Sequence, residues 1–186
     1  MKKLILAISG ASATSLALKF LKEAQKHQEC YVILSENAKI VALKEKGENL
    51  NQIIEKIGAR VYEEGEIWAG IASGSFGVNS MAVIPTSMNT LAKIACGIGD
   101  ELISRCASVM IKEKKTLLLA PREMPFSPIA LENMNKLANL GVIIAPPILG
   151  YYSGAKSLES MEDFLVGKWL DVLGVENDLY KRWEDK

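Results

Sequence analysis

Short apolar runs alternate along the chain with longer segments in which apolar residues recur at helical spacing. Each run is about four to seven residues long and stops at Gly, Ser or Pro, as a buried strand does. The predicted strands are Lys3–Ser9, Cys30–Leu34, Met81–Ile84, Thr116–Ala120 and Val142–Ala145.

The intervening segments predict amphipathic helices. In Thr14–Lys26, Leu16, Phe20 and Leu21 share one face, and the lysines lie off it. Asp100 is placed to cap a helix that runs to about Lys114, whereas Arg60–Trp68 has no clear period. The other predicted helices are Glu36–Lys46, Leu50–Ile57, Asn89–Ala95, Pro128–Gly141 and a last helix at about 160–174.

Strands that are continuously apolar and alternate with helices indicate a parallel sheet covered on both faces. The expected fold is therefore a three-layer, doubly wound α/β fold of the Rossmann or flavodoxin kind, with a mostly parallel sheet. No repeat or linker divides the chain, so we expect one domain over residues 1–186, ending in a short tail after the last helix.

Composition and charge narrow the function classes. Twenty-two Lys and Arg balance 22 Asp and Glu, and only 6% of residues are aromatic. A basic surface for nucleic acid and a base-stacking platform are both disfavoured. No apolar stretch approaches the roughly 20 residues of a membrane span.

The cysteines and the first residues bear on the compartment. The chain has an odd number of cysteines, namely Cys30, Cys96 and Cys106. They lack C-x-x-C spacing and lie in apolar runs, which predicts reduced thiols in the core of a cytoplasmic protein. The apolar run Leu4–Ile8 resembles a short signal peptide, but it falls below the roughly 7 residues that a signal requires. A buried first strand is the better interpretation.

Candidate chemistry gathers where strands end, because ligands of such sheets bind beyond the carboxyl ends of the strands. Gly10-Ala11-Ser12 precedes a helix, and Ser87–Thr90 repeats this pattern, so both segments suit a phosphate. Simple helix capping is the alternative for each segment. Arg122-Glu123 follows the most apolar strand and indicates either a ligand contact or an ion pair.

Other candidates are weaker. Arg105 and Lys112 lie seven residues apart on one predicted helix face, which is more often solvated than functional. His27 is the only histidine and follows a helix, so a His-based triad and a His metal site are poorly supported. Neither G-x-G-x-x-G nor a Walker A loop is present.

Taken together, these motifs resemble the UbiX/Pad family of flavin prenyltransferases. The resemblance runs from about Lys3 to Gly174. Its ordered motifs are Gly10-Ala11-Ser12, Ile71-Ala72-Ser73-Gly74-Ser75-Phe76, Pro85-Thr86-Ser87-Met88-Asn89-Thr90-Leu91, Arg122-Glu123 and Leu131-Glu132-Asn133-Met134.

The resemblance implies a reaction and its partners. The family joins the dimethylallyl group of dimethylallyl monophosphate to N5 and C6 of reduced FMN, without a metal. The prenylated FMN serves a UbiD-type decarboxylase. Family members form homo-dodecamers with sites at subunit contacts.

The resemblance also implies residue roles. FMN would be held by Gly10, Ala11, Ser12, Ser35, Ser87, Met88, Asn89, Thr90 and Arg122. The prenyl phosphate would meet Ser12, Arg105, Lys112, Glu123, Tyr152 and Lys168. Dimethylallyl phosphate becomes a good electrophile only when its leaving phosphate is neutralised, which suits these cations and a Glu123 general acid.

Four positions depart from the usual family pattern. Ala13 stands in place of Gly, Asn89 in place of Lys, and Met124 in place of Thr. Lys168 replaces an Arg, which keeps the charge but loses the bidentate fork.

Two other functions stay open at this point. A flavin-dependent cysteine decarboxylase of the same fold has a similar flavin segment, but it uses an active-site histidine and a Pro-x-Met-Asn clamp that have no counterpart here. A non-catalytic FMN-binding carrier is the second alternative, because Ala13, Asn89 and Lys168 depart from the pattern.

Overall fold

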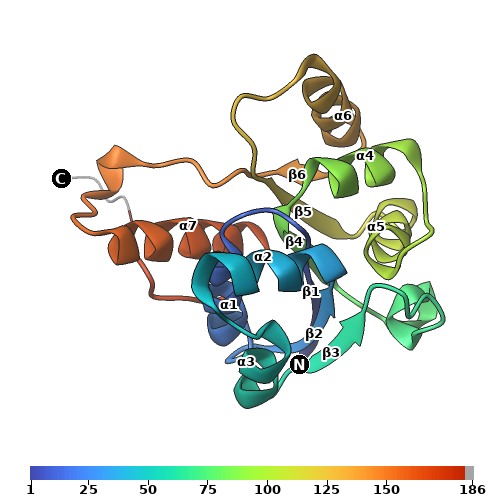
Figure 1. Ribbon diagram of the computed structural model, residues 1–186, viewed down its shortest axis with the longest axis horizontal. Coiled ribbons are helices and arrows are strands. Elements are labelled where there is room, and N and C mark those ends of the chain that lie inside the picture. The colour runs from blue at the N-terminus through green and yellow to red at the C-terminus, as the bar shows by residue number, and fades with distance from the viewer. Residues whose placement is uncertain (183–186) are drawn as a thin grey trace.

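Six strands form one sheet in the computed structural model, which describes residues 1–182 (Figure 1). All strand pairs are parallel, and the order is β3-β2-β1-β4-β5-β6. This is the order of a doubly wound Rossmann sheet, so the expected fold class is confirmed. The strands are β1 (Lys2–Ile8), β2 (Gln28–Leu34), β3 (Arg60–Glu63), β4 (Ser80–Thr86), β5 (Thr116–Pro121) and β6 (Ile143–Ile144).

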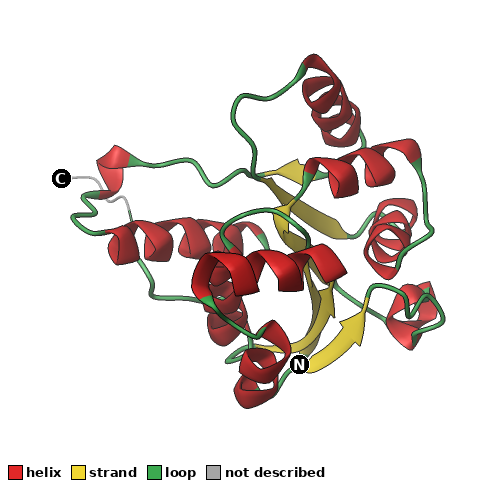
Figure 2. Ribbon diagram, in the orientation of Figure 1, coloured by secondary structure: helices red, strands yellow, loops and turns green. Residues whose placement is uncertain are grey.

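Helices cover both faces of the sheet (Figure 2). They are α1 (Thr14–Ala24), α2 (Glu36–Lys46), α3 (Leu50–Ile57), α4 (Met88–Cys96), α5 (Leu102–Lys112), α6 (Pro128–Asn139) and α7 (Leu158–Val172), with short 3₁₀ turns at Gly70–Ala72, Gly74–Phe76 and Tyr151–Ser153. Among the described residues, no helix combines the length and apolar character needed to cross a membrane.

The period of two along β1 divides the core between the faces. Leu4, Leu6 and Ile8 belong to the cluster under α1, α2, α3 and α7, while Ile5 and Ala7 belong to the cluster under α4, α5 and α6. All five side chains are buried. A strand buried on both faces must be apolar throughout, which is why β1 looks like a short signal peptide in sequence.

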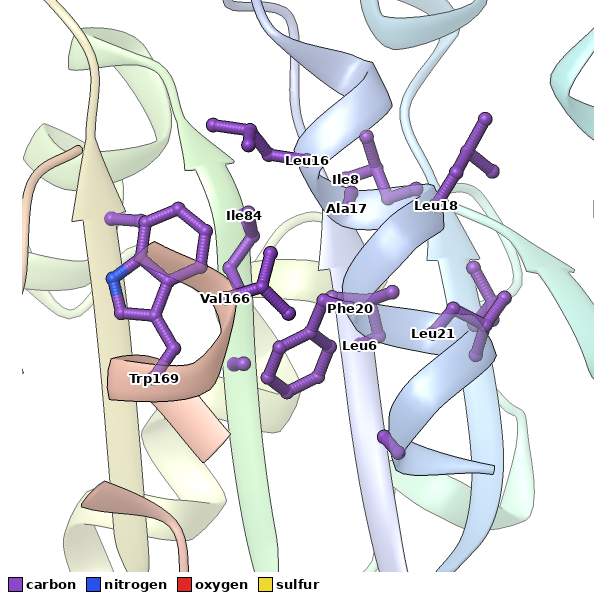
Figure 3. Close-up of a cluster of buried hydrophobic side chains, with 14 of the residues drawn as sticks. Leu6, Ile8, Leu16, Ala17, Leu18, Phe20, Leu21, Ile84, Val166 and Trp169 are labelled. Atoms are coloured by element: carbon purple, nitrogen blue, oxygen red, sulfur yellow. The ribbon is translucent and has the colours of Figure 1, made fainter. Parts of the chain in front are cut away.

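The core beneath α1 and α7 is built from large side chains (Figure 3). Phe20 of α1 is fully buried beside Val166 and Trp169 of α7. The indole Nε1 of Trp169 donates to the Ala145 carbonyl at 2.9 Å, just beyond β6. Burial of each such side chain contributes about 1.5–3 kcal/mol, and the indole bond keeps its polar atom satisfied.

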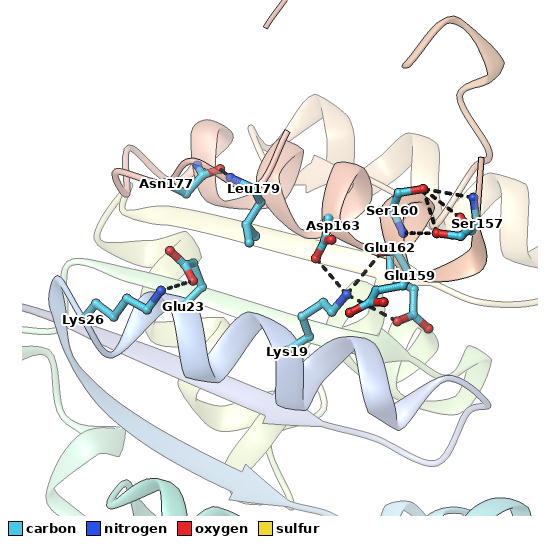
Figure 4. Close-up of polar contacts among 10 residues, drawn as sticks. All are labelled: Lys19, Glu23, Lys26, Ser157, Glu159, Ser160, Glu162, Asp163, Asn177 and Leu179. Carbon is cyan, nitrogen blue, oxygen red and sulfur yellow. Dashed lines mark hydrogen bonds and ion pairs between the residues drawn. The ribbon is translucent and has the colours of Figure 1, made fainter. Parts of the chain in front are cut away.

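A lysine joins the two helices of this layer (Figure 4). Lys19 Nζ of α1 lies 2.7 Å from Asp163 Oδ1 and 3.6 Å from Glu162 Oε2 of α7. It also donates to the Glu159 carbonyl at 3.2 Å. Ion pairs therefore lie at the edge of the apolar contact between α1 and α7.

The expectation of three core cysteines is wrong for one of them. Cys30 and Cys106 are buried, and burial raises the pKa of each thiol to about 12. Cys96 is exposed, because it is the last residue of α4 and follows the buried pair Ile94 and Ala95 around the helix. Its apolar neighbours in the sequence therefore do not place it in the core.

Candidate functional site

A cavity of about 290 Å³ opens at the carboxyl edge of the sheet, beyond the ends of β1, β4 and β5. The strand order reverses between β1 and β4, and this is where doubly wound sheets bind ligands. The cavity is lined by Gly10, Ala11, Ser12, Val41, Glu45, Ser87, Met88, Arg122 and Glu123. Four segments that are far apart in the sequence thus meet in one place.

The first wall is the loop between β1 and α1. A Cβ added at Gly10 would lie 2.4 Å from the Cβ of Asn37 on α2, so only glycine allows the loop to approach that helix so closely. Ala13 ends the loop in a left-handed conformation, with φ 79°. Ser12 is half-buried and lines the cavity, and its predicted contact with a ligand stays a prediction.

The second wall is the start of α4. Ser87 caps this helix, because its Oγ accepts from Thr90 N at 3.2 Å and lies 3.0 Å from Thr90 Oγ1. Ser87 and Met88 line the cavity, whereas Thr90 is buried behind them. Capping and cavity lining therefore coexist at Ser87, although they look like alternatives in the sequence. The first-turn N–H groups of a helix lack carbonyl partners, which suits an anionic ligand.

Ser35 has a different place. It caps α2 by accepting from Ala38 N at 3.0 Å, and its own N–H donates to the Ile8 carbonyl at 3.1 Å. It is buried and is not among the residues that line the cavity. Its predicted contact with a flavin stays a prediction.

The third wall is Arg122-Glu123 after β5. Arg122 N donates to the Thr86 carbonyl at 3.1 Å, which ties this exit to the end of β4. Glu123 Oε1 accepts from Met124 N at 3.0 Å. Within residues 1–182, neither side chain joins a salt bridge, so the ion-pair interpretation is not what the structure has.

The fourth wall comes from α2, whose residues were not predicted to belong to the site. Val41 and Glu45 lie one helical turn apart and both line the cavity. Glu45 Oε2 is 3.5 Å from Ala13 N, at the limit of a hydrogen bond. Their spacing of four residues places Val41 and Glu45 on one face of the predicted helix. Nothing in the sequence indicates that this face meets the loop after β1.

The remaining predicted site residues lie away from this cavity. Arg105 and Lys112 are exposed on α5, and Lys112 is its last residue, close to the start of β5 at the opposite edge of the sheet. Tyr152 packs edge-on against Phe164 with ring centres 5.5 Å apart, and Lys168 is exposed on α7. In Figure 1, α5 lies at the right and α7 at the left, with the sheet between them. One chain alone does not bring these four residues to the cavity.

The comparisons with known proteins agree with this geometry. The family model described as Flavoprotein matches residues 1–169. The strand order, the cavity at the switch point and this match define the protein as a flavoprotein. A flavin prenyltransferase UbiX from Helicobacter pylori is 56% identical over 183 residues, which are 97% of this chain and 98% of the relative. The chain belongs to the UbiX family of flavin prenyltransferases, and it is an enzyme.

Solved structures support the same assignment. AnUbiX in complex with FMN and dimethylallyl pyrophosphate is 33% identical, with a TM-score of 0.95 over 100% of this chain and 98% of that one. A dodecameric FMN-dependent UbiX-like decarboxylase from Escherichia coli O157:H7 is 34% identical, with a TM-score of 0.93 over 98% and 100%. The peptidyl-cysteine decarboxylase EpiD is 22% identical with a TM-score of 0.64, and this likeness extends to the fold alone.

Proposed function

We propose that this flavin prenyltransferase joins the dimethylallyl group of dimethylallyl monophosphate to N5 and C6 of reduced FMN and releases phosphate. The observation that carries the proposal is the meeting of three strand exits in one cavity, in a chain 56% identical to a UbiX enzyme. The cysteine-decarboxylase alternative has only a shared fold in its favour, and membership of an enzyme family argues against a carrier that has lost turnover.

The residues of the cavity fit FMN. Gly10, Ala11 and Ser12 leave room for a ligand against the backbone, and the helices that begin at Thr14 and Met88 favour its phosphate. Arg122 supplies the positive side chain among the cavity residues. Bound there, FMN would supply the nucleophilic N5 and C6 atoms. Ser35, Asn89 and Thr90, which do not line the cavity, complete the proposed FMN set; Ser35 and Thr90 are buried and Asn89 is exposed.

The donor phosphate requires cations and a proton. Glu123 lines the cavity and is the proposed general acid for the leaving phosphate, with Ser12 on the same ligand. Arg105, Lys112 and Lys168 would neutralise the phosphate charge, and Tyr152 would donate from its hydroxyl. Exclusion of water from the reacting allyl group would protect it from hydrolysis.

Because these last four residues lie away from the cavity of their own chain, we infer that neighbouring subunits supply them. A homo-dodecamer with sites at subunit contacts is the proposed assembly, supported by the dodecameric relative from Escherichia coli. The proposed setting is the cytoplasm, where a UbiD-type decarboxylase takes up the prenylated FMN. No metal is proposed, since cationic side chains meet the need for charge.

Mass spectrometry of the extracted flavin tests the proposal. The protein is incubated without oxygen with reduced FMN and dimethylallyl monophosphate, and in a parallel reaction with the diphosphate. We expect FMN to gain one prenyl unit from the monophosphate. Glu123→Gln should slow this gain at least about tenfold because it cannot deliver the proton.

Glu132→Gln is the matched control, because Glu132 is exposed on α6 and does not line the cavity. It should prenylate FMN at the rate of the unaltered enzyme. Unmodified FMN in every reaction would contradict the proposed donor. Equal rates for Glu123→Gln and the control would contradict the role of Glu123.

A further inference from the structure

The sheet loses its regular ladder where the cavity begins. Along β4 the pairing with β5 is regular from Ser80 to Val83, and the register then shifts before Thr86 pairs with Pro121. Pro85 lies inside this shift and has no N–H to give to a neighbouring strand. Two backbone bonds remain here, from Ser9 N to the Pro85 carbonyl at 3.3 Å and from Arg122 N to the Thr86 carbonyl at 3.1 Å, and two side-chain hydroxyl groups add to them.

Ser9 is the first of these groups. Its side chain is fully buried, and its Oγ donates to the Pro85 carbonyl at 2.9 Å. The same Oγ accepts from Ser87 N at 2.8 Å. The Ser9 hydroxyl thus joins the end of β1 to Ser87, the cap of α4, and both Ser87 and Gly10, the residue that follows Ser9, line the cavity.

Thr86 is the second group. It is fully buried, its Oγ1 donates to the Val83 carbonyl at 2.7 Å, and the same atom accepts from Ala120 N at 3.0 Å. Its backbone carbonyl accepts from Arg122 N at 3.1 Å. Thr86 therefore joins the end of β4 to the exit of β5 that carries Arg122 and Glu123.

We propose that Ser9 and Thr86 are positioning residues of the flavin site, which set the spacing of its three strand-exit walls. Neither residue lines the cavity, so they act through Ser87, Gly10 and Arg122 and not on a ligand directly. Each hydroxyl uses both its donor and its acceptor: Ser9 bonds Pro85 and Ser87 at the end of β4, and Thr86 bonds Val83 of its own strand and Ala120 of β5. This inference rests on the proposed flavin site.

The test uses Ser9→Ala and Thr86→Val, which remove a hydroxyl and leave an N–H without its acceptor, the part-buried Ser87 N–H in the first and the buried Ala120 N–H in the second. Ser104→Ala is the matched control. Ser104 is also buried, but its Oγ donates to the Glu101 carbonyl at 3.1 Å within one turn at the start of α5. It therefore joins no two walls of the cavity.

Three quantities are measured on each full-length protein: the FMN dissociation constant by fluorescence titration, the visible circular dichroism of bound FMN, and the melting temperature without FMN. We expect Ser9→Ala and Thr86→Val to bind FMN about tenfold more weakly, with altered visible dichroism, because the walls move apart. Ser104→Ala should keep the affinity and the dichroism of the unaltered protein. Thr86→Ser keeps the hydroxyl and should restore both.

A general loss of stability would lower the melting temperature in all three variants without changing the dichroism of the flavin that remains bound. That result, or an unchanged FMN affinity in Ser9→Ala and Thr86→Val, would overturn the positioning role. Failure of the unaltered protein to bind FMN would instead overturn the proposed site and this inference with it. If Ser9→Ala does not fold, Ser9→Cys replaces it, because sulfur is a weaker hydrogen-bonding atom in the same position.

Discussion

At the scale of single residues, Ala13 is in a backbone conformation that is usually left to glycine. Its φ of 79° and ψ of 37° are left-handed, which costs a residue with a Cβ about 1–2 kcal/mol. Ala13 is one of the positions at which this chain departs from the usual family pattern, which has Gly. Packing elsewhere in the fold must offset this cost.

Replacing Ala13 by Gly should therefore stabilise the protein. We expect the free energy of unfolding, from urea denaturation, to rise by about 1 kcal/mol, because relief of strain outweighs the added freedom of the unfolded chain. Lys114→Gly is the matched control, since Lys114 has φ 54° beyond α5, at the other edge of the sheet from the cavity. Lys114 is also left-handed, so Lys114→Gly should raise the free energy of unfolding as well. If Lys114→Gly raises it and Ala13→Gly lowers it, Ala13 is not strained.

Residues also mark the limit of prediction from the sequence. The position of Ser12, Ser87 and Arg122 at the carboxyl edge of the sheet was predictable, because each residue follows an apolar run that indicates a buried strand. Ser9 and Thr86 were not assigned a role, because each looks like part of a strand or turn. Their importance comes from hydrogen bonds to residues 76 to 78 and 34 positions away, which no local pattern contains.

At the scale of elements, the segment after α7 folds back onto that helix. Asp171 accepts from Arg182 Nη1 at 2.6 Å and Nη2 at 2.8 Å, and from Asn177 Nδ2 at 2.9 Å. Tyr180 stacks edge-on against Phe164 at 5.3 Å, and a Cβ at Gly167 would lie 2.4 Å from the Tyr180 ring. Phe164 in turn contacts Tyr152, so the folded-back segment supports a proposed site residue.

This contact should depend on pH. Partial burial disfavours the charge on Asp171, but hydrogen bonds from Arg182, Tyr180 and Asn177 outweigh it and hold the pKa of Asp171 below its ordinary value. A lowered pKa stabilises the folded state above the unfolded pKa of about 3.9, and this stability is lost as pH falls through the folded pKa. Asp171→Asn should lower the melting temperature at neutral pH, and the difference should shrink below about pH 4.

Melting curves of the unaltered protein and of Asp171→Asn, recorded from neutral to acid pH, measure this difference. Glu176→Gln is a control on the same segment, because Glu176 is exposed. It should track the unaltered protein at every pH. A difference for Asp171→Asn that stays constant with pH would contradict the charge-based account.

Elements differ in how well the sequence predicts them. Five strands follow from apolar runs, but β3 has only one buried residue, Tyr62, and lies at the edge of the sheet, so Arg60–Trp68 showed no period. The predicted cap at Asp100 is wrong. Glu101 holds the cap position of α5 without a side-chain bond, and Asp100 lies 3.2 Å from Lys93 Nζ of α4.

At the scale of the whole molecule, the proposed site is divided between distant surfaces. The cavity holds Ser12 and Glu123, while Lys112 and Tyr152 lie elsewhere. Exposed apolar side chains also crowd the segment that leads to α7, namely Ile148, Leu149, Tyr151, Tyr152 and Leu158. Apolar surface of this kind favours contact with another subunit. Both features support the proposed homo-oligomer.

Mixing two inactive variants tests this division. Glu123→Gln removes a residue of the cavity, and Lys112→Ala removes a residue of α5, so each homo-oligomer should lose prenylation. Subunits exchanged between the two should regain activity, because some sites then combine an intact cavity with an intact Lys112. Flavin mass spectrometry after mixing measures the recovery. If no activity returns although native mass spectrometry shows mixed oligomers, each site is complete within one chain.

The cavity also joins the two halves of the sheet. Gly10, Ala11 and Ser12 belong to the half β3-β2-β1, whereas Ser87 and Arg122 belong to the half β4-β5-β6. A ligand that contacts both halves binds only when both are folded, so its binding free energy is lost if either half opens. Occupancy therefore makes unfolding more cooperative: a half that could open on its own in the free protein can open in the complex only after the ligand dissociates.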